Sequence, residues 1–76
     1  MEEKMIGKYL KKKRLDLNVD QIEMARRLGT SQSYYSQLES GVRTPGLKMI
    51  RAIAREFGTE PAELRRLIGY GEEIDL

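Results

Sequence analysis

The sequence predicts an all-α domain built from five short helices. Glycine and proline divide the 76 residues into short segments, and the apolar residues within these segments recur every three or four positions, which is the spacing of one helix face. None of the segments has the alternating pattern of a strand. With 39% hydrophobic residues, a chain of this length can build one core, but it lies near the lower size limit for folding without a metal or a disulfide.

The first helix is expected to begin at Ile6. Ile6, Leu10 and Leu17 fall on one helical face, because residues four and seven positions apart coincide on a helix. Arg14 falls on the same face, whereas the neighbouring lysines point mostly to other faces. A turn is expected at residues 16–19.

The second helix is expected to cover residues 21–28. Asp20 is a good N-cap, and Glu23 occupies the capping-box position three residues later. Gly29 ends this helix, because glycine readily takes the positive φ found just beyond a helix end.

The third helix is expected at residues 32–40, with Ser31 as its N-cap and Gly41 as its end. The fourth helix follows a loop. Pro45 is expected at its first position, with Thr44 as its cap, because the fixed φ of proline suits the first turn of a helix. The apolar face of this fourth helix comprises Leu47, Ile50, Ile53, Ala54 and Phe57.

Gly58 closes the fourth helix and Pro61 opens a fifth. The apolar side of this fifth helix contains Leu64, Leu67 and Ile68. The chain is thus divided into an N-terminal arm (1–5), one helical domain (6–68) and an acidic C-terminal tail (69–76).

The charges are unevenly distributed, although the net charge is only +2. Six basic and no acidic residues lie between Lys4 and Arg14, whereas residues 72–76 carry three acids. A basic arm suits a polyanion, since neutralising phosphates releases counterions. A solvated face of the first helix explains the same charges equally well. The absence of cysteine excludes disulfides and cysteine-based metal sites.

Residues 21–40 meet the physical requirements of a helix-turn-helix, in which two helices cross at a steep angle around a tight turn. Such helices need a small residue where they approach, which Ala25 supplies, and a turn residue that tolerates left-handed geometry, which Gly29 supplies. They also need apolar residues on the facing sides, and these are Met24, Leu28, Tyr35 and Leu38. The complete set is a fairly specific signal, whereas one glycine would mean little.

Five stretches of the chain carry a family resemblance: IGKYLKKKR, DQIEMARRLGTSQSYYSQLESG, RTP, LKMIRAIAREFG and PAELRRL. Through them the chain resembles the Cro/cI-type (XRE) family of helix-turn-helix repressors over approximately residues 6–68. The resemblance implies a lambda-repressor-like domain whose helix 32–40 lies in the major groove of double-stranded DNA. It also implies a transcriptional repressor that binds a palindromic operator as a dimer.

The candidate base-reading residues are Gln32, Ser33, Ser36 and Gln37. Residues one, four and five positions after Gln32 share a helical surface with it. A glutamine amide can donate and accept at once, as the N7 and N6 groups of adenine require. The resemblance implies that Gln21 braces Gln32 and also touches the phosphate backbone. The alternative is that these polar residues only solubilise an exposed helix.

The candidate DNA-backbone contacts are Gln21, Arg43, Lys48, Lys11 and Tyr34, with Lys8 as a further lysine of this kind. Contacts of this class position a protein on DNA without specifying sequence. Arg43, in the loop after the third helix, is the strongest candidate. For each lysine, ordinary solvation is an equal alternative, and so is simple surface exposure for Tyr34.

The resemblance implies a structural ion pair between Arg14 and Glu39. A charge that faces the core must be paired, so we interpret Arg14 as structural rather than DNA-reading. Tyr35 stands where the family usually has a branched aliphatic residue. It should therefore pack inward, and its hydroxyl then needs a partner.

Three residues depart from the family pattern: Thr30, Asp20 and Ile22. Thr30 replaces a buried aliphatic residue, which should loosen the turn slightly. Asp20 caps its helix well but brings a negative charge near the expected phosphate path. Ile22 is apolar at a position that is usually polar.

An enzyme is not expected. The chain contains no histidine, cysteine or glycine-rich phosphate loop, and carboxylates such as Asp16 and Glu56 have no neighbouring nucleophile or base. No cofactor and no metal are expected either. The alternative function is a protein-interaction module, or an antitoxin-type subunit of the same fold within a larger complex. Such a surface would more often expose an apolar patch than short uncharged polar side chains.

A homodimer is expected, because one short helix contacts too few base pairs for useful selectivity. The expected contact surface is the fifth helix together with the tail residues Tyr70 and Ile74, and ordinary core closure is an equal alternative for the apolar residues of that helix. No stretch reaches the roughly 20 apolar residues of a membrane span, so no membrane contact is expected. The resemblance implies a cytoplasmic protein of bacterial, archaeal or phage origin that joins the nucleoid when bound to DNA.

Overall fold

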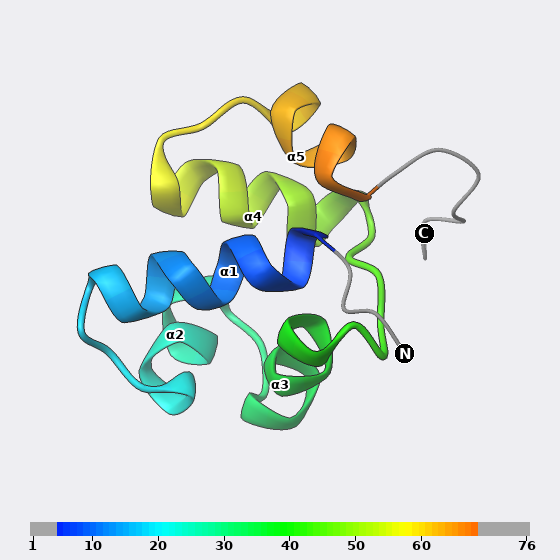
Figure 1. Cartoon of the computed structure of the whole chain (residues 1–76). Helices are drawn as coiled ribbons and strands as arrows, with labels where there is room; N and C mark the ends of the chain where they lie inside the picture. Colours follow the sequence, from blue (N-terminus) through cyan, green and yellow to red (C-terminus); the bar gives the residue numbers. More distant parts are fainter. Residues whose placement is uncertain (1–4, 69–76) are drawn as a thin grey trace.

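The computed structural model describes residues 5–68, and these residues form five helices and no strand (Figure 1). The helices are α1 (Met5–Asp16), α2 (Gln21–Leu28), α3 (Gln32–Ser40), α4 (Leu47–Phe57) and α5 (Pro61–Ile68). The expected all-α domain of five helices is therefore confirmed. The arm before Met5 and the acidic tail, with Tyr70 and Ile74, lie outside the described residues. None of these five helices is long and apolar enough to cross a membrane.

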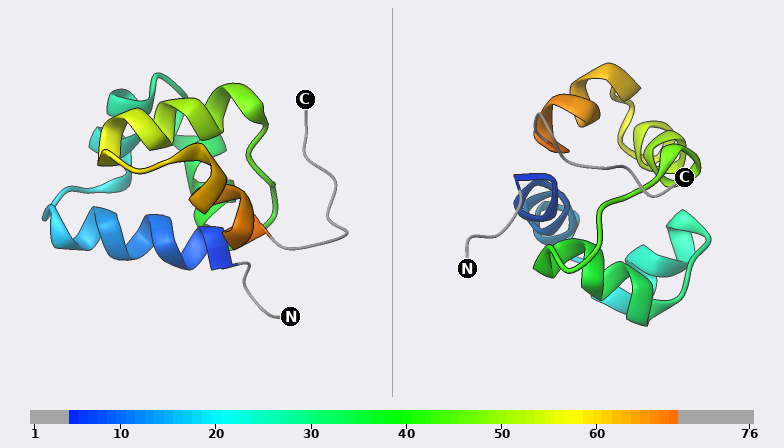
Figure 2. Two further views of the ribbon diagram at one scale, coloured as in Figure 1. Left: turned by 90° about the horizontal axis from the view of Figure 1, so that it is seen from above. Right: turned by 90° about the vertical axis from the view of Figure 1, so that its right-hand side faces the viewer.

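The five helices close into a ring around one core. Helix α1 packs against α3 and α5, α2 packs against α3 and α4, and α4 packs against α5. Figure 1 shows α1 between the α2–α3 pair and the α4–α5 pair, and the right-hand view of Figure 2 shows these two pairs on opposite sides of the core. The buried apolar residues of the core are Ile6, Leu10, Met24, Ala25, Leu28, Tyr35, Leu38, Ile50, Ile53, Ala54, Leu64 and Ile68.

The local signals for the ends of the helices are mostly confirmed. The side chains of Asp20 and Ser31 each accept a hydrogen bond from the backbone N–H three residues later, at 2.8 and 3.1 Å. The capping box at α2 is only half formed, because the Glu23 carboxylate pairs with two arginines of its own helix instead of reaching back. Positive φ angles occur at the expected stops, which are Gly29, Gly41 and Gly58.

Three local expectations differ from the structure. Helix α4 begins at Leu47 with Gly46 as its N-cap, and not at Pro45 with Thr44 as the cap. Thr44 and Pro45 are both buried, so burial of this segment overrides the preference of proline for a first helical turn. Leu17 lies beyond the end of α1 and is 47% exposed. It leaves the apolar face because the helix ends before reaching it. Helix α1 also begins one residue earlier than expected.

Candidate nucleic-acid interface

The α2–turn–α3 unit is held together by small and apolar residues. Ala25 is 2% exposed, and its carbonyl accepts a hydrogen bond from the Thr30 N–H at 2.9 Å. Gly29 has a φ of +74°, which a residue with a Cβ adopts only under strain. The other apolar residues expected at this contact are all buried: Met24, Leu28, Tyr35 and Leu38. Thr30 is half-buried. The turn therefore fixes the direction in which α3 leaves α2.

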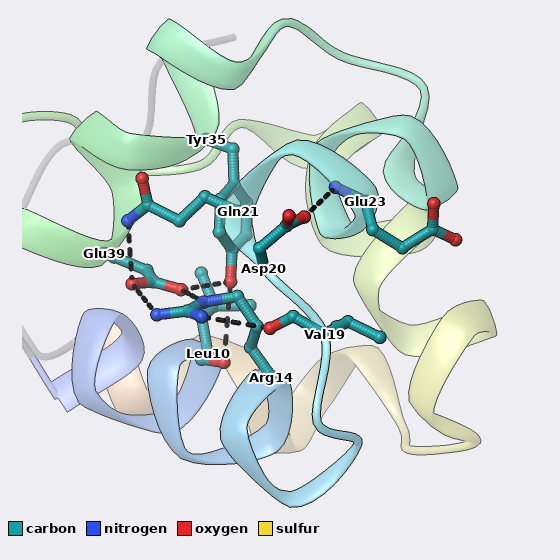
Figure 3. A network of polar contacts seen from close by, with 8 residues as sticks. All are labelled: Leu10, Arg14, Val19, Asp20, Gln21, Glu23, Tyr35 and Glu39. Carbon is teal, nitrogen blue, oxygen red and sulfur yellow. Dashed lines mark hydrogen bonds and ion pairs between the residues drawn. The ribbon is translucent and has the colours of Figure 1, made fainter.

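A polar network ties α3 to α1 and α2 (Figure 3). Arg14 of α1 meets the Glu39 carboxylate with two nitrogens, at 2.6 Å (Nε) and 3.3 Å (Nη2). A third nitrogen, Nη1, donates to the Val19 carbonyl at 3.1 Å. The Gln21 amide of α2 and the Tyr35 hydroxyl of α3 also donate to the Glu39 carboxylate. One carboxylate thus accepts from three helices, and it fixes α3 against the α1–α2 corner.

Protonation within this network is set by burial and hydrogen bonding. Burial raises the pKa of the Glu39 carboxyl, but hydrogen bonds from Arg14, Tyr35 and Gln21 outweigh it and hold the pKa below its ordinary value. Burial, followed by the hydrogen bond to Glu39, raises the pKa of the Tyr35 hydroxyl. The hydrogen bond to Glu39 also raises the pKa of Arg14. At neutral pH the carboxylate is therefore charged and the tyrosine remains a donor.

Gln21 belongs to this network and does not brace Gln32. Its amide nitrogen donates to the Glu39 carboxylate at 3.1 Å, and no hydrogen bond joins Gln21 to Gln32 within residues 5–68. Sequence reasoning assigned the brace from the resemblance. The structure directs the amide toward a buried charge instead, because charge-assisted hydrogen bonds are the stronger ones.

The outward face of α3 carries the four candidate base-reading residues. Gln32 and Ser33 at the start of the helix are exposed, and Ser36 and Gln37 in its second half are partly exposed. The opposite face is buried and tied to the core by Tyr35, Leu38 and Glu39. The helix therefore presents four uncharged hydrogen-bonding side chains on one surface.

Arg43 reaches back from the loop after α3 to the last of these four residues. Its Nε donates to the Gln37 side-chain oxygen at 2.9 Å, and its backbone N–H donates to the Gln37 carbonyl at 3.1 Å. The candidate backbone contact and the candidate base reader are thus joined directly. Neither composition nor spacing indicates this contact, because it depends on the path of the chain beyond Gly41.

The basic candidates divide into two separate places. Lys8 and Lys11 are exposed on α1, where they border a shallow hollow that contains no residue of α3. Lys48 and Tyr34, by contrast, line one groove of about 1190 Å³ between α4 and the end of α2. Tyr34 is half-buried against the edge of the core. The structure thus brings Lys48 into one groove with Tyr34 of α3, whereas no residue of α3 lines the hollow beside Lys8 and Lys11.

Sequence reasoning missed Arg51 and Arg55 on the same groove. Together with Lys48 they form a stripe along α4, since residues three and four positions apart are neighbours on a helix. None of the three forms an ion pair within residues 5–68. The arginines of α2 on the opposite wall differ, because Arg26 and Arg27 both pair with Glu23, whose carboxyl pKa they lower to about 2. The spacing of three and then four residues between Lys48, Arg51 and Arg55 was the sequence pattern that could have predicted this stripe.

Gly7 is a further residue whose role sequence reasoning missed. A Cβ at this position would lie 2.5 Å from the backbone oxygen of Glu39 and 2.8 Å from that of Leu38. Only glycine therefore lets α1 approach the backbone at the end of α3 this closely. Nothing in the sequence around Gly7 indicates this contact, because the partner residues lie in a distant segment of the chain.

Two helices packed against each other, a glycine turn between them and an outward polar face define α2–turn–α3 as a helix-turn-helix. Comparison with known proteins identifies the family. A helix-turn-helix family model matches residues 10–64. An ImmF control region 10 kDa protein of Bacillus phage phi105 is 37% identical over 54 residues, which are 71% of this chain and 60% of that protein. An HTH-type transcriptional regulator of Bacillus subtilis (strain 168), YqaF, is 33% identical over 54 residues, 71% of each chain.

The chain belongs to the Cro/cI-type (XRE) family of helix-turn-helix proteins, which are DNA-binding transcription regulators. The chain spans less than two thirds of the length of the phage relative. Within residues 5–68, no three His, Cys, Asp or Glu side chains group together as metal ligands would.

Proposed function

We propose that this protein is a sequence-specific transcriptional regulator that reads an operator with α3 in the major groove of DNA. One observation carries the proposal. The inner face of α3 is anchored by the Glu39 network, while its outer face presents Gln32, Ser33, Ser36 and Gln37. A rigid helix with short donors and acceptors on one surface is what direct readout of base edges requires.

The dimensions and charges around α3 support this placement. An α-helix with its side chains is about 10–12 Å in diameter, which fits a major groove about 12 Å wide, and the nine residues of α3 give it a length of about 13 Å. Arg43 follows α3 in the chain, and Lys48, Arg51 and Arg55 line the groove beside it. These cations suit the phosphate backbone on that flank. Asp20 at the N-terminus of α2 is exposed and negative, so it weakens a phosphate contact there.

We further propose that the protein acts as a dimer on a palindromic operator. A helix of nine residues covers only one half-site, and two copies would present their recognition helices about 34 Å apart, one turn of B-DNA. Leu64 and Ile68 are buried in the core of the monomer, so they are not available as a dimer surface. The dimer contact is assigned to the outer face of α5, including the half-exposed Leu67, and to the tail.

Repression is the proposed regulatory effect, because occupying an operator suffices to block access to it, whereas activation also needs a contact with another protein. The names of the relatives, a transcriptional regulator and a control region protein, support a regulatory role. A reporter gene placed behind the selected operator tests the direction. Expression should fall when the protein is supplied, and a rise would contradict repression.

Selection of bound sequences from a random DNA pool, followed by titration at several salt concentrations, tests DNA recognition. We expect one palindromic sequence, with an affinity that falls steeply as salt rises. Salt-sensitive binding without any sequence preference would contradict the proposal. Absence of DNA binding, with capture of a partner protein instead, would favour the interaction-module alternative.

A further inference from the structure

We propose that the acidic C-terminal tail (69–76) binds in the basic groove of its own molecule when the protein is free of DNA. The basic groove is the groove of about 1190 Å³ between α4 and the end of α2. There the tail occupies the cations that the proposed function assigns to the phosphate backbone, so it competes with DNA. This competition rests on the proposed function, whereas the docking itself can be measured without DNA.

The α4 wall of the basic groove carries positive charges without partners. Lys48, Arg51 and Arg55 are exposed and form no ion pair within residues 5–68. Among the described residues that line the groove, Glu56 is the one carboxylate, and it already lies 3.6 Å from Arg27 of α2. Like charges three and four positions apart on a helix destabilise one another. The wall therefore favours an acidic occupant.

The inside of the groove is apolar. Tyr34, Met49 and Ala52 are half-buried and pack against the core, and Leu47 beside them is half-buried as well. All four side chains line the groove. An occupant therefore needs acidic side chains for the α4 wall together with apolar side chains for the interior.

The tail contains both kinds of side chain. Its last five residues are three acids and two large apolar residues: Glu72, Glu73, Asp75, Ile74 and Leu76. In an extended chain Glu72 and Asp75 are about 10 Å apart at 3.3 Å per residue. Lys48 and Arg55 are likewise about 10 Å apart along α4 at 1.5 Å per residue. The acids of the tail thus match the cations of α4 in number, in sign and in length.

The tail is long enough to reach the groove. Helix α5 packs against α4, and Figure 1 and the left-hand view of Figure 2 both place the end of α5 at the same end of the molecule as the start of α4. Residues 69–76 span about 26 Å when extended, compared with a longest dimension of the molecule of 32 Å. The tail can therefore pass around α4 to the groove.

The basic hollow on α1 fits the tail less well. Its volume is about 300 Å³, and among the described residues that line it the exposed Leu15 is the only apolar one. Lys12, one of its three lysines, already pairs with Asp16 at 3.1 Å. The hollow therefore lacks the apolar interior that Ile74 and Leu76 need.

Docking also links DNA binding to the proposed dimer. A tail held in the groove of its own molecule is not available for contact with a second copy. When phosphates take the cations of α4, the tail is released, and DNA binding and dimer contact therefore favour each other.

A spin label on the tail tests the docking directly. The chain contains no cysteine, so Leu76→Cys provides a single attachment site, and an apolar nitroxide label replaces an apolar side chain. In the full chain at low salt and without DNA, the magnetic resonance signals of the Met49 and Ala52 amides should broaden, while those of Lys8 and Lys11 stay sharp. The broadening should decrease at high salt, because salt screens exposed charges.

Sharp signals at the groove, or broadening at the α1 lysines instead, would overturn the docking. Mixing spin-labelled molecules with isotope-labelled molecules that carry no spin label separates contacts within one molecule from contacts between molecules. Broadening at the groove in the mixed sample would show that the tail of a second copy occupies it, which contradicts the proposal.

Operator affinity tests the competition. The full chain is compared with the tail variant Glu72→Gln/Glu73→Gln/Asp75→Asn, which keeps the length and the apolar residues of the tail. A tail that occupies the groove for about two thirds to nine tenths of the time raises the apparent Kd by about 3- to 10-fold. The neutral tail should therefore bind the operator more tightly by about this factor. No gain in affinity would overturn the competition.

A lower negative charge also raises affinity for DNA by itself, so the gain is measured again in two altered backgrounds. In Arg51→Ala/Arg55→Ala the tail has lost its binding site, and the gain should fall below about twofold. The matched control Lys8→Ala/Lys11→Ala removes two exposed cations elsewhere, and there the full gain should persist. Equal gains in both backgrounds would overturn the competition. If the protein prefers no operator at all, the proposed function fails, and the spin label still decides whether the tail docks.

Discussion

The ion pair between Arg14 and Glu39 offers the most direct test of what holds the recognition helix in place. We consider Arg14→Met and Glu39→Met, singly and together. Each single change removes one partner and leaves the other charge buried, since the two side chains are only 12% and 6% exposed. The double change replaces both charges with apolar groups of similar length. The single variants therefore measure the free energy lost when one buried charge is left without a partner. The double variant measures the free energy lost when the whole ion pair is removed.

The magnitudes follow from burial and from the other partners of Glu39. Breaking a buried pair costs about 3–5 kcal/mol, and we expect the lower end here because Arg14 retains some contact with water. For a domain of this size, about 3 kcal/mol lowers the melting temperature by about 12–24 °C. The double variant orphans no charge, but Gln21 and the Tyr35 hydroxyl lose their acceptor. It should lose about 2 kcal/mol instead of the additive sum of about 6 kcal/mol.

Urea denaturation at pH 7, followed by far-UV circular dichroism, measures these differences as shifts in midpoint at constant slope. Where Glu39→Met leaves too little folded protein for a complete curve, Glu39→Gln gives the same comparison with a loss of about 1–2 kcal/mol. Single losses that add up to the double loss within about 0.5 kcal/mol would refute the reasoning, since the two side chains would then act independently.

Three further predictions concern packing, readout and pH. Gly7→Ala should cost about 2 kcal/mol or more, because its Cβ would press on the backbone oxygen of Glu39 at 2.5 Å, while thermal melts of the exposed neighbour Lys8→Ala should shift by less than about 0.5 kcal/mol. Gln32→Ala should leave the melting temperature unchanged but cost about 1–3 kcal/mol in binding at one operator base pair, and a stability loss would show that Gln32 is structural. The folded-state pKa of Glu39 lies below its ordinary value of 4.5, so its stabilising effect is complete above that pH and is lost as pH falls below it. The stability advantage over Glu39→Gln, measured by urea titration, should therefore narrow below pH 4.5, and a constant difference down to pH 3 would contradict the assigned ionisation.

Most of the fold could be predicted because its signals are local. Asp20 and Ser31 cap helices through bonds that span three residues, and Gly29 ends α2 through its own backbone freedom. The start of α4 could not be predicted in this way. Pro45 carries a correct local signal for a helix start, but the segment is buried and the helix begins two residues later. Tertiary packing overruled local preference there.

The candidate site likewise has features that the sequence predicted and features that only the structure revealed. Residue types and helical spacing indicated the polar face of α3, because the side chains of one helix face are set by its period. The partners of those side chains were not accessible from spacing. Gln21 turns to Glu39 and Arg43 turns to Gln37, and each choice depends on where a separate segment of the chain is placed.

By itself, the sequence determined that this protein has five helices, a helix-turn-helix and a neutral polar face on its third helix, since all three follow from patterns within about 20 residues. Only the tertiary structure decided that α1 meets α3 at Gly7, that Glu39 accepts from three helices, and that Arg43 turns back to Gln37. These features arise between segments distant in the chain. Contact distance and hydrogen-bond complementarity select them once the ring of helices has closed.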